Sequence, residues 1–219
     1  MACILAGLAS ATRNIGVLLL IPLVFEWSDR PKYSWRRGAA YLALVPSGLV
    51  VYMAYLWWHF GNPLLFYHAQ ANWGRQPAGL GTLWSAFSLA YEDALALFNP
   101  ANYEPFSFGR LIFVVGEAND LYNLIFLLFA LTVLFAGWRL LPVELSIYAL
   151  IIVGVSVLFA PVASPLQSTP RYMLAAFPLF IVLSAAVLEN RKALAWWLPI
   201  SAAASLVFTM LFVSWYFVA

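Results

Sequence analysis

The chain has 219 residues, of which 64% are hydrophobic and only 9% are charged, and its formal net charge is +2. Soluble domains carry about 25% charged residues, so the composition excludes an ordinary soluble domain and predicts an integral membrane protein. No basic nucleic-acid-binding surface and no glycine-rich nucleotide loop is present in the sequence. A single cysteine, Cys3, excludes an internal disulfide bond. His59 and His68 have no carboxylate at ligand spacing, so we expect no metal site and no cofactor.

Apolar segments recur along the chain at lengths that suit a membrane. A transmembrane helix needs about 20 apolar residues, which leaves room for five to six spans and one sizeable loop. We therefore expect an all-α, polytopic transmembrane helix bundle. The expected spans are residues 2–25, 38–58, 121–137, 143–162, 172–188 and 195–217.

The first of these segments is interrupted by the polar run Ser10–Asn14, which contains Arg13. It is either one long helix with a buried arginine or two short helices that meet at a polar tip. A third interpretation is an arginine that extends to the membrane interface. We favour the broken helix, because Thr12 and Asn14 can satisfy freed backbone groups. In the second segment, Pro46 and Gly48 predict a kink.

The basic residues predict the orientation of the chain. Cytosolic loops of membrane proteins are enriched in lysine and arginine. Seven of the eleven basic residues fall on one side of the expected topology: Arg30, Lys32, Arg36, Arg37, Arg139, Arg191 and Lys192. Residues 60–118 then form an extracytoplasmic loop region, which holds several acidic residues.

Within that loop region, residues 84–97 have the pattern of an amphipathic helix. Apolar residues recur at three- and four-residue steps, which predicts a helix lying in the membrane interface; they are Trp84, Phe87, Tyr91, Leu95 and Phe98. Pro100 ends the pattern. Glu92 and Asp93 fall on another side, where we expect a solvated face, although one carboxylate there has the chemistry of a general base.

Arg171 is the first candidate for a binding residue. It follows Pro170 at the expected head of a helix, near the outer face. A guanidinium fits phosphate oxygens, and backbone N–H groups at a helix N-terminus also attract anions. The alternatives are a structural ion pair with an acidic loop residue and contact with a lipid headgroup.

A second candidate site lies in the outer loop. Aromatic, amide and basic side chains crowd together between residues 67 and 75, and they include His68, Gln70, Trp73 and Arg75. Aromatic rings cover apolar sugar faces and amides bond hydroxyls, so the composition suits a sugar. A loop that anchors the protein at the interface explains the same residues equally well.

Three stretches together resemble the PIG-V-type mannosyltransferases of the GT-C glycosyltransferase superfamily. They are LASATRNIGVLLLIPL (8–23), FGNPLLFYHAQANWGR (60–75) and STPRYMLAAFPLF (168–180). The resemblance covers nearly the whole chain but only the C-terminal part of such an enzyme, so residues 1–219 are expected to be part of one transmembrane domain. By position, Arg171 and Tyr172 match the family's Arg-Tyr element. Gln70, Trp73 and Arg75 match its outer-loop element, and Arg13 matches its early polar break.

The resemblance implies an integral, multi-pass enzyme of a bacterial inner membrane or the endoplasmic reticulum. It implies transfer of mannose from a polyprenyl- or dolichyl-phosphate donor to a lipid-linked or glycan acceptor on the outer face. The family's catalytic acidic residue usually lies in an earlier outer loop, so we expect the chain to be a fragment whose catalytic residue is upstream. Membrane lipids are further expected partners, and nucleic acid is not. The alternatives are a polytopic transporter or flippase, indicated by Arg13 and the kink at Pro46, and a non-catalytic membrane subunit.

Overall fold

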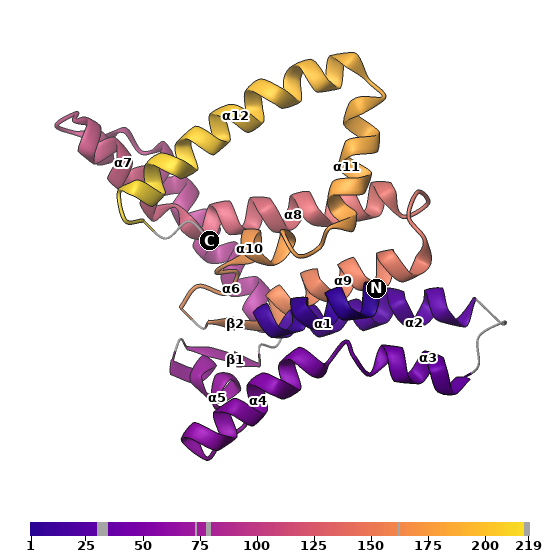
Figure 1. The fold of residues 1–219 in the computed structure, drawn as a ribbon. Helices are drawn as coiled ribbons and strands as arrows, with labels where there is room; N and C mark the ends of the chain where they lie inside the picture. The colour runs from indigo at the N-terminus through magenta and orange to yellow at the C-terminus, as the bar shows by residue number, and fades with distance from the viewer. Residues whose placement is uncertain (30–34, 73, 78–79, 162, 217–219) are drawn as a thin grey trace. The chain divides into compact units, whose positions relative to one another are not determined.

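The computed structural model describes residues 1–29, 35–72, 74–77, 80–161 and 163–216 (Figure 1). The described residues are predominantly helical, with one short pair of strands. The chain divides into two compact units, each of which combines two separate parts of the sequence. Unit 1 contains Met1–Trp73 and Pro142–Ile152, and unit 2 contains Gly74–Leu141 and Val153–Ala219.

Two of the described helices are long and apolar enough to cross a membrane: α8 (Asn119–Gly137) and α12 (Arg191–Val213). A third candidate is a helix pair, Arg36–Leu42 and Ser47–Phe60, which is bent by 53°. The other apolar helices have 10–17 residues, which is short of the length that a straight span requires. Among the described residues, the structure therefore contains candidates for two or three of the five to six expected spans.

The N-terminal segment of unit 1 is broken at the polar tip. Helix α1 (Ala2–Thr12) ends before Arg13, whose backbone is extended (φ −147°, ψ 132°), and a 3₁₀ helix η1 (Asn14–Leu19) then leads into α2 (Leu20–Ser28). The Thr12 hydroxyl donates to the carbonyl of Ala9 at 2.8 Å. The side chain of Asn14 accepts the N–H of Ile15 at 2.9 Å. The prediction of a broken helix is confirmed.

The other described elements of unit 1 are also helices. Helix α3 (Trp35–Leu42) is followed by a turn and α4 (Ser47–Phe60), which confirms the kink, and α5 (Leu65–Asn72) comes next. Helices α1 and α4 pack against each other. At their contact Gly48 lies against the carbonyl of Gly7, where a side chain would overlap the opposing backbone. Helix α9 (Val143–Leu158) belongs to unit 1 through residue 152.

Unit 2 is organised around α8. Helix α6 (Leu80–Phe98) packs along it, and α7 (Phe108–Glu117) follows α6 after a short 3₁₀ turn, η2 (Pro100–Tyr103). The face of α6 that is buried carries Ala86 and Ala90, each 1% exposed. The expected apolar stripe is instead exposed, with Trp84 at 79%. Because they contain α5, α6 and α7, residues 60–118 are helical over most of their described length. Helix α6 ends at Phe98, as predicted.

The expected span over residues 172–188 is wrong, because it consists of two helices. Helix α10 (Thr169–Met173) ends early, and α11 (Pro178–Leu188) begins at a proline. Pro178 has no N–H to offer to the carbonyl four residues before it, so the helix is interrupted at that point. Helix α11 packs on α8 at Gly137, where any larger residue would overlap Val182.

Candidate functional site

A short antiparallel ribbon brings the outer-loop segment beside the turn that follows α9. Strand β1 (Arg75–Pro77) pairs with β2 (Phe159–Pro161), and Arg75 lies opposite Pro161 (Figure 1). The expected span over residues 143–162 ends at Leu158 for this reason, since residues 159–161 are extended in the ribbon. The ribbon lies within unit 2. Its pairing sets the position of the Arg75 backbone, from which the side chain extends.

The guanidinium of Arg75 joins two sequence stretches that were expected to bind substrate. Its Nη1 donates to Oη of Tyr172 at 2.8 Å, and its Nη2 donates to Oγ of Ser168 at 3.3 Å. Nη1 also lies 3.5 Å from the carbonyl oxygen of Phe159. The guanidinium carbon is 5.7 Å from the centre of the Tyr172 ring, which is within cation–π range. All these acceptors are uncharged, so they orient the cation without neutralising it.

The turn that holds these partners is itself buried and conformationally unusual. Ser168 is 2% exposed and has φ 71°, the left-handed region that non-glycine residues rarely occupy. Thr169 is fully buried, and its hydroxyl donates to the carbonyl of Leu166 at 2.6 Å. A left-handed residue costs about 1–2 kcal/mol. Such conformations persist where surrounding contacts enforce them, and they are common at functional sites.

Two carboxylates link this turn to α8 and α6. Oδ2 of Asp93, on α6, accepts the backbone N–H groups of Asp120 and Leu121 at 2.9 and 3.0 Å. It therefore caps the first turn of α8, whose N–H groups have no partner within the helix. Asp120 in turn accepts a hydrogen bond from the hydroxyl of Ser164. The carboxylates connect α6, α8 and the turn.

Asp93 was expected on a solvated face, and that expectation is wrong. Glu92 is exposed, but Asp93 is partly buried against α8, because the small residues on its side of α6 allow close packing. Burial raises the pKa of the Asp93 carboxyl above its usual value, and the hydrogen bond from Leu121 lowers it. The nearby charge of Asp120 raises the pKa again, and Glu117 acts in the same direction.

An apolar groove of about 280 Å³ lies between α8, α10 and α11. Among the described residues that line it, Arg171 is the one charged side chain, and the others are Phe126, Phe129, Pro170, Met173, Leu174, Leu179, Phe180 and Leu183. The expected helix N-terminus does not contribute a site here. Helix α10 has only five residues, and the N–H of Arg171 already donates to the carbonyl of Ser168 at 3.1 Å.

The other predicted site residues that the structure describes belong to unit 1, whereas Arg75, Arg171 and Tyr172 belong to unit 2. Arg13 lies at the helix break in unit 1, and His68 and Gln70 lie on α5, also in unit 1. His68 and Gln70 are both exposed, and residues two apart on a helix point to different sides; their role in binding a substrate stays a prediction. Trp73 lies outside the described residues.

The structure therefore brings Arg75 and Tyr172 together in unit 2, and Arg171 precedes Tyr172 in α10. Sequence reasoning missed Ser168 and Ser164, because an isolated serine in a polar turn carries no pattern that marks it. Comparisons with known protein families, curated proteins and solved structures find no match for the chain.

Proposed function

We propose that this chain belongs to a polyprenyl-phosphate-dependent membrane glycosyltransferase, with mannose as the transferred sugar. The observation that carries the proposal is the 2.8 Å hydrogen bond between Arg75 and Tyr172. It connects two of the three stretches that resemble PIG-V-type enzymes, although they are 97 residues apart in the sequence. We place the protein as a multi-pass protein of a bacterial inner membrane or the endoplasmic reticulum, with this site on the outer face.

The chemistry of the cluster suits a lipid phosphate. The groove beside α8 offers apolar contacts to a polyprenyl chain, and Arg171 at its lining offers a cation to the phosphate. Tyr172 accepts a hydrogen bond from Arg75, so its own O–H is free to donate to a phosphate oxygen. Arg75 adds positive charge to the same region and fixes the orientation of the tyrosine.

In the reaction we propose, an acceptor hydroxyl oxygen attacks the anomeric carbon of the donor sugar. The bond between that carbon and the phosphate oxygen breaks, and the polyprenyl phosphate leaves with the electron pair. A base takes the hydroxyl proton. Cationic and hydroxyl donors aimed at the leaving phosphate stabilise the charge that grows on it. The phosphate needs no proton to leave, so the site requires no general acid for this step.

The test is a two-part assay on the full-length gene product reconstituted in lipid nanodiscs. The first part measures retention of polyprenyl phosphate, and the second measures transfer of labelled mannose from polyprenyl-phosphate mannose to extracted lipid acceptors. We expect Arg171→Ala to weaken retention by at least tenfold and to lower transfer by about 10²–10³-fold, the usual effect of removing one transition-state donor. Arg191→Ala is the matched control, because Arg191 is an exposed arginine at the start of another helix. Wild-type retention and transfer by Arg171→Ala would reject the role given to Arg171.

A transporter or flippase is the second candidate. The break at Arg13 and the 53° bend before α4 favour it, since transporters place substrates at interrupted helices. Flux of a lipid phosphate across proteoliposome membranes without any covalent product would support this function over glycosyl transfer.

A further inference from the structure

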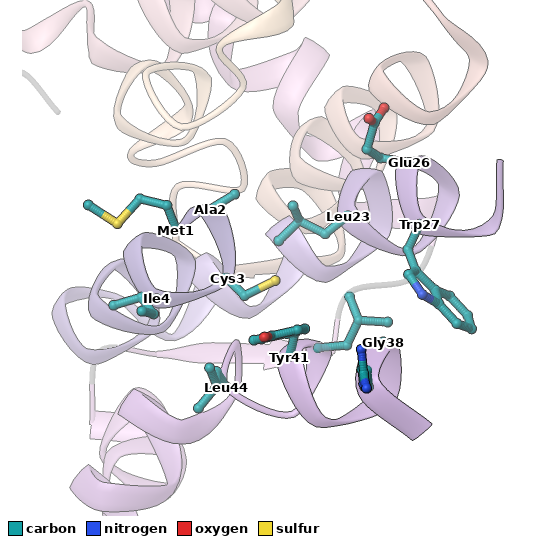
Figure 2. Close-up of a pocket in the computed structure, with 12 residues that line it drawn as sticks. Met1, Ala2, Cys3, Ile4, Leu23, Glu26, Trp27, Gly38, Tyr41 and Leu44 are labelled. Atoms are coloured by element: carbon teal, nitrogen blue, oxygen red, sulfur yellow. The ribbon is translucent and has the colours of Figure 1, made fainter. Parts of the chain in front are cut away.

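Unit 1 contains an apolar cavity that the proposed glycosyl transfer does not use. The cavity has a volume of about 430 Å³ and lies between α1, α2 and α3 (Figure 2). Its lining residues are Met1, Ala2, Cys3, Ile4, Leu23, Glu26, Trp27, Arg37, Gly38, Tyr41, Leu42 and Leu44. A volume of this size falls within the range of small-molecule sites, about 300–1,000 Å³.

The lining selects a hydrocarbon over a polar ligand. Ten of the twelve lining side chains are uncharged, and most are aliphatic or aromatic. In Figure 2 the thiol of Cys3 and the ring of Tyr41 lie toward the middle of the site, with Leu23 and Leu44 around them. The carboxylate of Glu26 points away from these side chains. An alkyl chain makes favourable apolar contacts with walls of this composition.

A cation stands where the cavity meets the start of a candidate membrane span. Arg37 lines the cavity, and it lies in the first turn of the bent helix pair that begins at Arg36. The orientation predicted from the basic residues places this end at the cytosolic leaflet, where anionic lipids are concentrated and basic pockets between membrane helices bind their headgroups.

We propose that this cavity binds an anionic glycerophospholipid, with one acyl chain between α1, α2 and α3 and the phosphate at the guanidinium of Arg37. The occupant matches both properties of the site, since a glycerophospholipid carries an alkyl chain and a phosphate at adjoining positions. The ligand does not react, and the site is separate from the cluster of Arg75 and Tyr172. The tests of lipid binding below therefore do not depend on whether the protein transfers a sugar.

The first test measures lipid retention with a matched pair of variants. The 219-residue protein is purified in detergent with phosphatidylglycerol or phosphatidylcholine, and native mass spectrometry counts bound lipids. Arg37→Gln and Arg36→Gln each remove one positive charge from the same turn of α3, but Arg36 is not part of the cavity lining. We expect Arg37→Gln to weaken phosphatidylglycerol retention about fivefold, the contribution of one basic residue near an anionic surface, and Arg36→Gln to weaken it by less than twofold.

The result that overturns the proposal is equally specific. Equal effects of the two variants would mean that general surface charge attracts the lipid. Equal retention of phosphatidylcholine and phosphatidylglycerol would mean that the site does not distinguish an anionic headgroup from a neutral one. Either outcome rejects a specific anionic-lipid site.

The single thiol gives a second readout that does not depend on the arginines. Cys3 lines the cavity and is partly exposed, so a bound acyl chain should slow its alkylation by an apolar maleimide. We expect phosphatidylglycerol to slow the reaction at least threefold relative to detergent alone. Ala2→Trp fills the cavity without changing its charge and should reduce lipid retention, whereas Ala40→Trp, outside the lining, should not. An alkylation rate that the lipid leaves unchanged would reject occupancy of the cavity.

Discussion

Replacing Tyr172 with phenylalanine removes the acceptor of the 2.8 Å hydrogen bond from Arg75 and leaves the aromatic ring in place. The change therefore keeps the cation–π contact, at 5.7 Å, and isolates the hydrogen bond. A hydrogen bond to a charged group contributes about 1.5–3 kcal/mol to stability. This one is only partly buried and Arg75 keeps Ser168 as a partner, so we expect a contribution at or just below the lower end of that range, about 1–1.5 kcal/mol.

A double-mutant cycle measures that value without the other effects of each substitution. The cycle combines Tyr172→Phe with Arg75→Met, and unfolding by sodium dodecyl sulfate in mixed micelles, followed by circular dichroism, gives the free energy of unfolding. We expect a coupling energy of about 1–1.5 kcal/mol, within the range for residues in direct contact. Tyr91→Phe is the control partner, because the Tyr91 side chain is exposed on α6, and its coupling with Arg75→Met should be close to zero. A coupling energy below about 0.3 kcal/mol between Arg75 and Tyr172, the size expected for independent sites, would refute the contact.

Three further predictions concern the elements around this contact. Because the pKa of Asp93 is raised in the folded protein, the folded state holds that proton more tightly than the unfolded chain. Its contribution to stability is complete at low pH and is lost as the pH rises through the raised value, with a slope of at most about 1.4 kcal/mol per pH unit. Asp93→Asn should reduce this loss in a pH series of unfolding experiments, and Glu92→Gln should leave it unchanged. Gly137→Ala should destabilise the protein by about 1–3 kcal/mol through overlap with Val182, and Val182→Ala in the same chain should restore part of that loss; no restoration would place the overlap elsewhere. Ser168→Gly should be more stable than Ser168→Ala by about 1–2 kcal/mol, since both lose the hydroxyl but only glycine adopts φ 71° without cost; equal melting temperatures would contradict the left-handed backbone.

Features that depend on neighbouring residues could be predicted from the sequence. The break at Arg13, the kink near Pro46 and the end of α6 at Phe98 all follow from a polar run or a proline within a few residues. Such signals act through the local backbone, because proline removes a donor and polar side chains compete for carbonyl groups. Pro178 is a local signal of the same kind for the interruption before α11. The prediction of one span over residues 172–188 did not take this proline into account.

The packing of α6 could not be predicted in the same way. Periodicity identified its apolar stripe, but in a membrane protein an apolar face is as stable against lipid as against protein. The face that packs on α8 carries Ala86 and Ala90, in keeping with the small residues that membrane helices use to approach closely. The burial of Asp93 follows from this contact. The pairing of Arg75 with Tyr172 could likewise not be predicted from the sequence, because it depends on the tertiary arrangement of segments that are 97 residues apart.

The separation between Arg75 and Tyr172 also has a consequence for biosynthesis. Chains are synthesised at about 5–20 residues per second, so the ribosome needs roughly 5–20 s to add the 97 residues that separate the arginine from its tyrosine. Strand β1 likewise cannot form its hydrogen bonds until β2 (Phe159–Pro161) has been synthesised. During that interval the nascent protein carries a guanidinium without either partner, next to the helices that are entering the membrane. The half-made chain is therefore the state in which insertion factors and proteases would encounter this segment, and substitutions that remove Ser168 or Tyr172 as partners would leave Arg75 with fewer hydrogen bonds after synthesis as well.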